Sequence, residues 1–246
     1  MNSIKKWRDG LGFSLTVLFM SAQPLKAEVQ FLDLNKEFPW IFGQPNSEQV
    51  SSKIEKATRQ LAQPLSAIQD QDLVYPESPY LIRLDSGRFF LHPVIFLARK
   101  TPNEVCTPDR TKNAPRYFCI EGQRRTNQAH IFVLNMQYQQ VGYHQLKLNL
   151  PYEYFANAIV AVGTGHKARN EIIAIVQHFP IDRKVASQAS EIGSGWTRTA
   201  ILLRAKQDND QIIFEQADSC LGNPNTIDNI LEARKRLKVC QSNIPQ

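Results

Sequence analysis

Apolar residues gather in three pairs of short runs between His130 and Ala217, and polar turns separate the runs. The pairs read HIFVLNM with YHQLKLN, AIVAVG with EIIAIVQH, and TAILLRA with QIIFEQA. Short runs rich in Ile, Val, Leu and Phe, bounded by Gly, Asn or Asp, are typical of β-strands. We therefore predict three successive β-hairpins in this region, and they determine the class of the fold.

A further hairpin is predicted from Tyr80 to His92. YLIRL alternates apolar and polar residues, Asp85-Ser86-Gly87 supplies a turn, and RFFLH returns. Pro93 has no N–H to donate to a strand ladder. We therefore expect the VIFLA run beyond it to be either a new strand or a sheet edge.

A helix is predicted from Ser47 to Gln63. Asn46 or Ser47 can cap its N-terminus, and Pro64 ends it. Apolar residues recur on one face at helical spacing, namely Val50, Ile54, Ala57 and Leu61. The other face is charged and is most simply a solvated surface.

A second helix is predicted from a Thr226 cap to about Val239. Its apolar stripe comprises Ile227, Ile230, Leu231 and Leu237. Its last turns are basic, at Arg234, Lys235, Arg236 and Lys238. Cations there suit the negative end of the helix dipole, so the basic residues need no partner to explain them.

The predicted strands far outnumber the helices, which indicates a mainly β fold. We expect an antiparallel β-sandwich-like assembly of hairpins with short flanking helices. Residues 28–79 would form an N-terminal arm and helix packed on a β-rich domain, residues 80–246, that ends in a short helix. A partial or small β-propeller is the alternative, although the hairpin starts at Ile131, Ile159 and Ala200 share no fixed period.

The N-terminus has the layout of a secretory signal peptide over residues 1–27. A short apolar run from Leu11 to Ala22 follows a basic start at Lys5, Lys6 and Arg8. The run is shorter than the roughly 20 residues that span a bilayer. We therefore predict a protein of the periplasm or cell exterior, with an uncleaved N-terminal anchor as the alternative.

Without residues 1–27 the chain is only weakly basic. The full chain has 29 Lys and Arg residues against 23 Asp and Glu, a formal net charge of +6. Residues 1–27 contain four of the basic residues and one of the acidic residues, so 25 and 22 remain and the net charge falls to +3. So small a charge does not indicate nucleic-acid binding, and no later apolar stretch predicts stable membrane insertion.

The chain contains four cysteines, and an even number in an exported chain predicts two disulfides. Of the possible pairings we favour Cys106–Cys119 with Cys220–Cys240, because each closes a short loop and loop-closure entropy favours near partners. A four-cysteine zinc site is the rival interpretation. The spacing lacks the close ligand pairs that such sites carry.

The segment from Glu28 to Pro45 is rich in aromatic residues and has no clear period. Phe31, Phe38, Trp40 and Phe42 are its aromatic residues. They could dock the arm onto the core, which is the commoner arrangement, or form an exposed binding lip.

The five histidines, His92, His130, His144, His166 and His178, show no ligand pattern such as H-E-x-x-H. If the hairpin after His130 turns over residues 137–142, His130 faces about Asn149 and His144 faces about Asn135. The two would then lie well apart along the ladder. We predict no bound metal.

No cofactor motif is predicted either. Gly163-Thr164-Gly165-His166 resembles a phosphate-cradling turn, but a phosphate loop needs a helix behind it. The following EIIAIVQHF reads as a strand, so we interpret the glycines as parts of a hairpin turn.

Ser194, in Gly193-Ser194-Gly195-Trp196, is the one candidate nucleophile, with His166 or His178 as its base. The sequence lacks the G-x-S-x-G spacing and the strand-to-helix elbow that present such a serine. A polar loop over residues 184–198, with Trp196 anchoring the next strand, is the competing interpretation.

A long polar loop between Lys100 and Gln128 carries a local excess of cations and the first cysteine pair. Its region, residues 99–125, contains Arg99, Lys100, Arg110, Lys112, Arg116, Arg124 and Arg125 against Glu104, Asp109 and Glu121. Arginine-rich loops of this kind suit an acidic protein surface, although a charged loop can also serve solubility alone. We take Arg110, Lys112, Arg116, Arg124 and Arg125 as the candidate binding residues.

The sequence alone favours an exported, disulfide-stapled, non-enzymatic binding protein. It would act by contact with another protein that has an acidic surface, as an inhibitor or an immunity-type protein does. Two alternatives stay open: a hydrolase assembled from dispersed residues, and a structural accessory of an envelope assembly.

Overall fold

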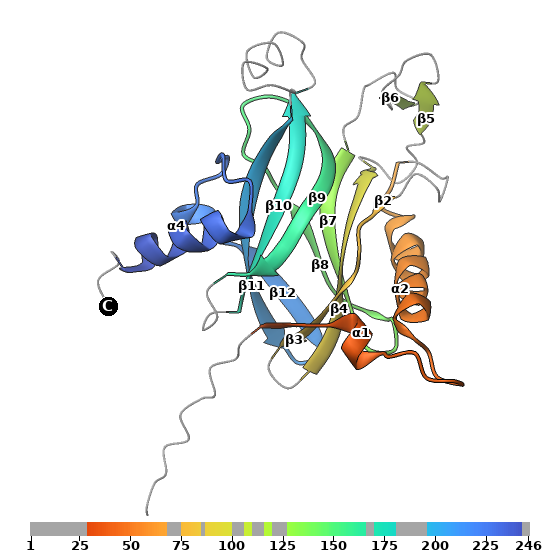
Figure 1. Cartoon of the computed structure of the whole chain (residues 1–246). Coiled ribbons are helices and arrows are strands. Elements are labelled where there is room, and N and C mark those ends of the chain that lie inside the picture. The colour runs from red at the N-terminus through yellow and green to blue at the C-terminus, as the bar shows by residue number, and fades with distance from the viewer. Residues whose placement is uncertain are drawn as a thin grey trace, which may run out of the picture.

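A computed structural model of the chain describes residues 29–67, 75–84, 87–99, 106–109, 116–119, 127–165, 170–180 and 196–242. Most of its strands form a single curled sheet that closes nearly into a barrel (Figure 1). Helix α2 packs on one side of this barrel and helix α4 on another (Figure 1).

The large sheet contains ten strands. They are β1 Gln30–Leu32, β2 Tyr75–Pro76, β3 Tyr80–Leu84, β4 Gly87–Leu97, β7 Asn127–Leu134, β8 Gln140–Leu146, β9 Tyr154–Thr164, β10 Glu171–Pro180, β11 Thr197–Asp208 and β12 Gln211–Gln216. A separate hairpin consists of β5 Cys106–Asp109 and β6 Arg116–Cys119. The helices are α1 Leu34–Glu37, α2 Ser47–Ala62, a 3-10 turn η4 Asp218–Cys220, and α4 Ile230–Ser242.

The mainly β prediction is confirmed, and so are the hairpins β3–β4, β7–β8, β9–β10 and β11–β12. The order of the strands is β1-β3-β4-β7-β8-β12-β11-β10-β9, with β2 paired to β4. The hairpins thus share one sheet whose opposite parts face each other, and the described residues form no separate propeller blades. Because β9 also contacts β4 and β7, the curled sheet encloses its own core.

One contact in this sheet is parallel. It joins β12 to β8, where Ile212 lies opposite Gly142. A Cβ atom at position 142 would come within 2.7 Å of the Ile212 carbonyl oxygen. Glycine is therefore required for β8 and β12 to approach closely enough to continue the sheet.

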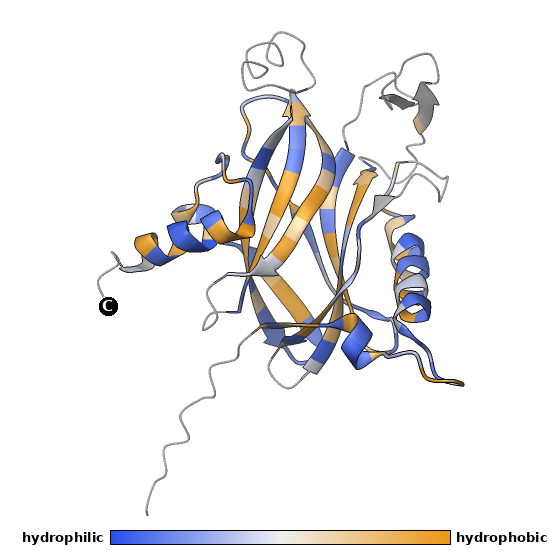
Figure 2. Ribbon diagram, in the orientation of Figure 1, coloured by the Kyte–Doolittle hydropathy of each residue, from blue (hydrophilic) through white to orange (hydrophobic). Residues whose placement is uncertain are grey.

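Alternate residues of the strands face one apolar core inside the barrel, as the period of a β-strand requires. This inner cluster includes Leu91, Ile95, Ile131, Val133, Ile172, Ala174, Ile201, Leu203, Ile212 and Phe214. Apolar residues that face outward on β4, β7, β10 and β11 are covered by the helices instead. Figure 2 shows the resulting apolar strands and the polar outer surfaces of α2 and α4.

Helix α2 confirms the predicted capping and period. The Asn46 side chain accepts a hydrogen bond from Gln49 N at 3.0 Å, and the Gln49 side chain accepts one from Asn46 N at 3.3 Å. This reciprocal capping box satisfies backbone donors that a helix start leaves free. Val50 and Ile54 are buried against Phe90 of β4, so α2 closes the outer face of β3, β4 and β7.

Strand β4 runs through Pro93 without a break and is paired on both sides beyond it, so neither the expected new strand nor the expected sheet edge occurs. Glu77 N donates to Pro93 O at 3.0 Å, which places the proline nitrogen on the same side of the strand. On that side the neighbour of β4 changes from β3 to β2. The missing N–H therefore falls where no ladder bond is needed.

The C-terminal helix begins at Ile230, later than the predicted Thr226 cap. Asn229 provides the cap, since its side chain accepts from Glu232 N at 2.8 Å. Ile227 is buried before the helix begins, while the predicted core residue Leu231 is exposed. The confirmed disulfide between Cys220 and Cys240 ties the helix to η4, across a sequence separation of 20.

Polar side chains bond the backbone of β11 and of the residues after β8 at positions where no neighbouring strand does so. Asn225 accepts from Ala200 N at 3.0 Å and donates to Ala200 O at 2.8 Å. The Gln216 side chain bonds Lys147 in the same way: it accepts from Lys147 N at 3.0 Å and donates to Lys147 O at 2.7 Å. Asp218 adds a bond from Leu202 N at 2.7 Å. Each side chain satisfies backbone groups that the strands leave unpaired.

Side chains also close the remaining gap in the barrel, between the β2–β3 segment and β9. Glu77 accepts a hydrogen bond from Ile159 N at 3.4 Å. The Tyr80 ring next to it packs edge-on against Phe31 of β1. The Glu77 carboxylate thus takes the place of a strand partner for Ile159 N of β9.

Replacing Asn225 by Ala should destabilise the barrel by about 2–4 kcal/mol, because the buried Ala200 N and O would lose their partners. Urea unfolding monitored by circular dichroism measures the change. Asn157→Ala is the matched control, since Asn157 is exposed on β9. Equal unfolding free energies for the two variants would show that the side-chain ladder contributes nothing.

Replacing both Cys220 and Cys240 by Ser should lower the free energy of unfolding by about 3 kcal/mol, which is the loop-closure contribution expected for a loop of this length. Urea unfolding without reductant provides the measurement. A midpoint identical to that of the unchanged protein would rule out a structural role for this crosslink.

Candidate functional site

The hairpin β5–β6 is attached to the rim of the barrel through Cys106. Cys106 N donates to Ala67 O at 2.8 Å, and Ala67 N donates to Leu97 O at 2.7 Å. Ser66 forms an isolated bridge with Ala98 at the same place. Residues 65–67, which follow α2, therefore extend the end of β4 and form a base on which the hairpin starts (Figure 1).

A disulfide holds the hairpin at that base. Cys106 is disulfide-bonded and buried, and the strand register places it opposite Cys119. This arrangement agrees with the predicted pairing of these two cysteines. The hairpin register ends with Asp109 opposite Arg116, so residues 110–115 connect its strands.

The predicted cationic site falls only partly within the described residues. Arg116 begins β6, whereas Arg110, Lys112, Arg124 and Arg125 lie outside the described residues. Arg99 has a structural role, because its Nε donates to Ser66 O at 3.1 Å and its backbone N donates to Leu65 O at 2.7 Å. The hairpin base is thus fixed by one of the cations of the region.

The aromatic N-terminal segment divides into a docked part and an exposed part. Phe31 packs on Tyr80 and Phe38 packs on Phe90, so these two residues dock the segment as expected. Trp40 and Phe42 instead remain 77% and 92% exposed. With Ile41, which is 48% exposed, they form an apolar tip in the connection between α1 and α2.

This connection is a short loop with a fixed base. Ser47 N donates to Phe38 O at 3.0 Å and closes the loop, and Gln44 N donates to Ile41 O at 3.0 Å within it. Gly43 has φ +80°, which a turn of this kind requires and which glycine adopts without strain. Sequence reasoning left the exposure of the tip open, although its three consecutive apolar residues, bracketed by Pro39 and Pro45, fit neither a helix nor a strand period.

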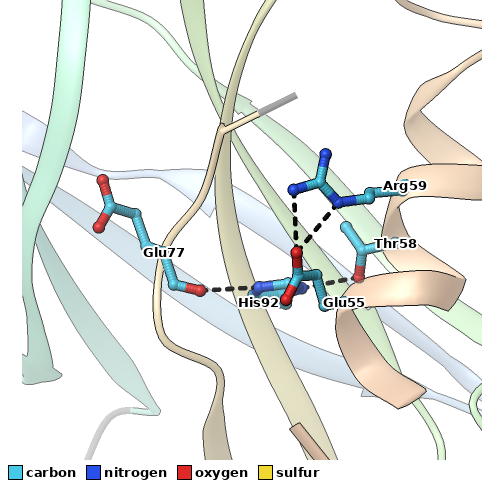
Figure 3. Close-up of polar contacts among 5 residues, drawn as sticks. All are labelled: Glu55, Thr58, Arg59, Glu77 and His92. Atoms are coloured by element: carbon cyan, nitrogen blue, oxygen red, sulfur yellow. Dashed lines mark hydrogen bonds and ion pairs between the residues drawn. The ribbon is translucent and has the colours of Figure 1, made fainter. Parts of the chain in front are cut away.

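A cleft of about 490 Å³ lies between the start of α2 and the segment that joins β2 to β3. Its lining includes Asn35, Glu48, Ser51, Glu55, Glu77 and His92. Figure 3 shows His92 between the backbone of Glu77 and Thr58 of helix α2. Glu55 is engaged by Arg59, with Nη2 2.9 Å from its carboxylate.

His92 has a structural role in this cleft. Burial lowers its pKa to about 4, so the ring is neutral near pH 7. Its Nε2 lies 2.8 Å from Glu77 O, which can only accept, and therefore carries the proton. Its Nδ1 then accepts from the Thr58 hydroxyl at 2.8 Å. With both nitrogens engaged (Figure 3), His92 offers neither a base nor a metal ligand.

Two other buried histidines are also held neutral. Burial lowers the pKa of His178 to about 4 and that of His130 to about 3. His178 Nε2 donates to the Thr199 hydroxyl at 3.1 Å, because that hydroxyl donates in turn to Asn225 O. His130 stacks on Phe96, with the ring centroids 4.1 Å apart. Both rings are therefore packed as core residues.

The predicted separation of His130 and His144 was wrong. The β7–β8 turn is tighter than expected and contains a bulge, so His130 lies opposite Gln145 and His144 lies opposite Ile131. The two histidines are thus one position apart along the ladder, on opposite faces of the sheet. Consistent with this, no group of three or more His, Cys, Asp or Glu residues that could hold a metal occurs within the described part of the chain.

The candidate nucleophile Ser194 and its candidate base His166 lie outside the described residues. Trp196, just beyond Ser194, packs edge-on against Phe179 of β10 at 4.6 Å between ring centroids. This contact agrees with the predicted anchoring role of Trp196 at the start of β11.

Among the described residues, the helices are all too short or too polar to cross a membrane. Comparison with protein-family models, with curated proteins and with solved structures found no match to this chain. The candidate sites are therefore judged from their own chemistry.

Acid should destabilise the protein through His92, His130 and His178. Their pKa values are lowered to about 4, 3 and 4 in the folded chain, whereas an unfolded histidine titrates near 6.5. The unfolded chain therefore binds more protons as the pH falls from about 6.5 to about 4, and each histidine removes about 1.4 kcal/mol of stability per pH unit. The stability that each neutral histidine contributes is fully present above about pH 6.5, the unfolded pKa, and it is lost as the pH falls toward the folded pKa.

His92→Gln tests this linkage, because an amide can keep both hydrogen bonds without titrating. Urea unfolding at pH 7 and pH 5 should show a smaller acid loss for the variant, by about 1.4 kcal/mol per pH unit. An unchanged difference between the two pH values would mean that His92 does not couple folding to protons.

Proposed function

We propose that this chain is an exported, disulfide-stapled binding protein of the periplasm or cell exterior that acts by contact with another protein. The disulfide between Cys220 and Cys240 supports an oxidising location, because such crosslinks persist outside the cytosol. Without residues 1–27 the net charge is only +3, which supports a protein partner over nucleic acid.

The observation that carries the proposal is the attachment of the β5–β6 hairpin. Its base is held by the Cys106–Ala67 hydrogen bond, by a disulfide at Cys106 and by the bonds of Arg99 to residues 65–66. A loop that only keeps a protein soluble has no need of a fixed base. A binding loop does, because ordering it beforehand lowers the entropy lost on association.

The cations of this hairpin region indicate the charge of the partner's surface. In this proposal Arg110, Lys112, Arg116, Arg124 and Arg125 contact carboxylates on an acidic protein surface. Guanidinium groups suit this role because each can donate two parallel hydrogen bonds to one carboxylate. Opposite charges also speed the encounter, so the binding should weaken as salt rises. An inhibitor or an immunity-type protein would work in this way.

Reversing Arg124 and Arg125 to Glu should weaken binding of the partner at least tenfold and leave folding unchanged. The partner is first captured on the immobilised protein from an envelope extract of the source cells and identified by mass spectrometry. Its affinity is then measured by titration calorimetry at two salt concentrations.

Reversing Lys235 and Arg236 to Glu provides the matched control. These two residues form an adjacent, exposed basic pair on α4, so the change in net charge is the same. If both double variants bind the partner as the unchanged protein does, the hairpin region is not the binding site. If both lose affinity equally, net charge and not the hairpin governs the interaction.

A further inference from the structure

We infer that the tip formed by Trp40, Ile41 and Phe42 docks on the surface of a lipid bilayer. The inference goes beyond the proposed protein contact, because it concerns a different surface. Figure 1 shows α1 and the α1–α2 connection at one end of the barrel and the β5–β6 hairpin at the other. The tip of that connection is apolar and projects away from the body (Figure 2).

The exposure of the tip is not a consequence of poor packing around it. Phe38, directly before the tip, packs on Phe90, and Asn46, directly after it, caps α2. Glu37 also binds Arg88 of β4, with Nη1 2.7 Å from the carboxylate. Both ends of the loop are therefore fixed to the barrel, and the fold holds the three apolar side chains in water.

The size of the tip argues against a stable protein interface. An aromatic side chain buries about 150–250 Å² at most, so the three residues together offer roughly 400–500 Å². A stable interface takes about 800 Å² from each partner. The rest of a protein interface would have to come from the polar side chains around the tip, which include Asn35, Lys36, Gln44 and Glu48. A bilayer requires no complementary surface of this kind.

The backbone of the tip suits entry into the interfacial region of a membrane. Backbone donors that leave water without a partner are costly. Pro39 and Pro45 have no N–H, and the N–H groups of Gln44 and Ser47 are already bonded to Ile41 O and Phe38 O. At these four positions the loop therefore has no donor that would lose its water, and the N–H groups of residues 40–43 stay hydrated as long as the tip remains at headgroup depth.

The side chains have the chemistry of that region as well. Indole rings concentrate at the membrane–water interface, where one edge is apolar and the N–H stays hydrated. Residues 39–45 carry no charge. Docking should therefore depend on apolar burial and not on the headgroup charge, and it should persist in high salt.

Flotation with phosphatidylcholine vesicles tests the inference on the protein purified from the secreting cells. The unchanged protein should float with the vesicles. Replacing Trp40 and Phe42 by Ser should lower the bound fraction at least tenfold, while circular dichroism and the thermal midpoint stay the same because both side chains are exposed. Residues 1–28 are treated identically in both proteins, so any contribution from them cancels.

Replacing Leu231 and Val239 by Ser is the matched control. These residues are 63% and 62% exposed on α4, so the control also removes two exposed apolar side chains, from a different surface. This control should float as the unchanged protein does, also in about 1 M NaCl, where charge interactions are screened beyond about 3 Å.

Three outcomes would overturn the inference: no flotation of the unchanged protein, equal flotation of the Trp40 and Phe42 variant, or release of the unchanged protein by salt. If the unchanged protein does not float but the tip variant loses affinity for the captured protein partner, the tip belongs to a protein interface.

Discussion

Side chains that hydrogen-bond to strand backbone hold the barrel closed where neighbouring strands do not pair. Asn225 and Gln216 each bond both the N–H and the C=O of one backbone residue, as a neighbouring strand would. Along the other gap, Glu77 accepts one hydrogen bond from Ile159 N of β9. Without these bonds the strands would leave backbone groups such as those of Ala200 and Ile159 without partners, which would destabilise the closed sheet.

This closed sheet gives its attachments fixed positions. The β5–β6 hairpin begins on the rim that residues 65–67 build, and the tip of Trp40 to Phe42 rests on α1 and α2. Both attachments combine a rigid base with side chains that the core does not need. Such an arrangement favours binding, because a surface that is already ordered loses less conformational entropy when a partner binds. The buried histidine His92, engaged at both nitrogens, belongs to the scaffold instead.

Local patterns in the sequence predicted the hairpins and α2, because alternation, helical period and a capping residue act within one element. The closure of the sheet could not be predicted, since Asn225 and Ala200 meet only in the folded chain. The same limit applies to the tip. The sequence places Phe38 and Trp40 in one aromatic segment. Only the folded chain brings Phe90 next to Phe38, so that Phe38 docks on the core and Trp40 does not. Within the predicted cationic region, the structure describes the base of the β5–β6 hairpin and the register of its two strands.

The proposed function requires a closed barrel whose disulfides form in an oxidising compartment. Peptide mapping by mass spectrometry, without reductant, of the protein purified from its source cells tests this requirement. The account predicts one crosslinked pair of peptides containing Cys220 and Cys240, a second containing Cys106 and Cys119, and an N-terminus near Glu28. Four free thiols, or an intact N-terminus on a protein retained in the cytosol, would contradict it.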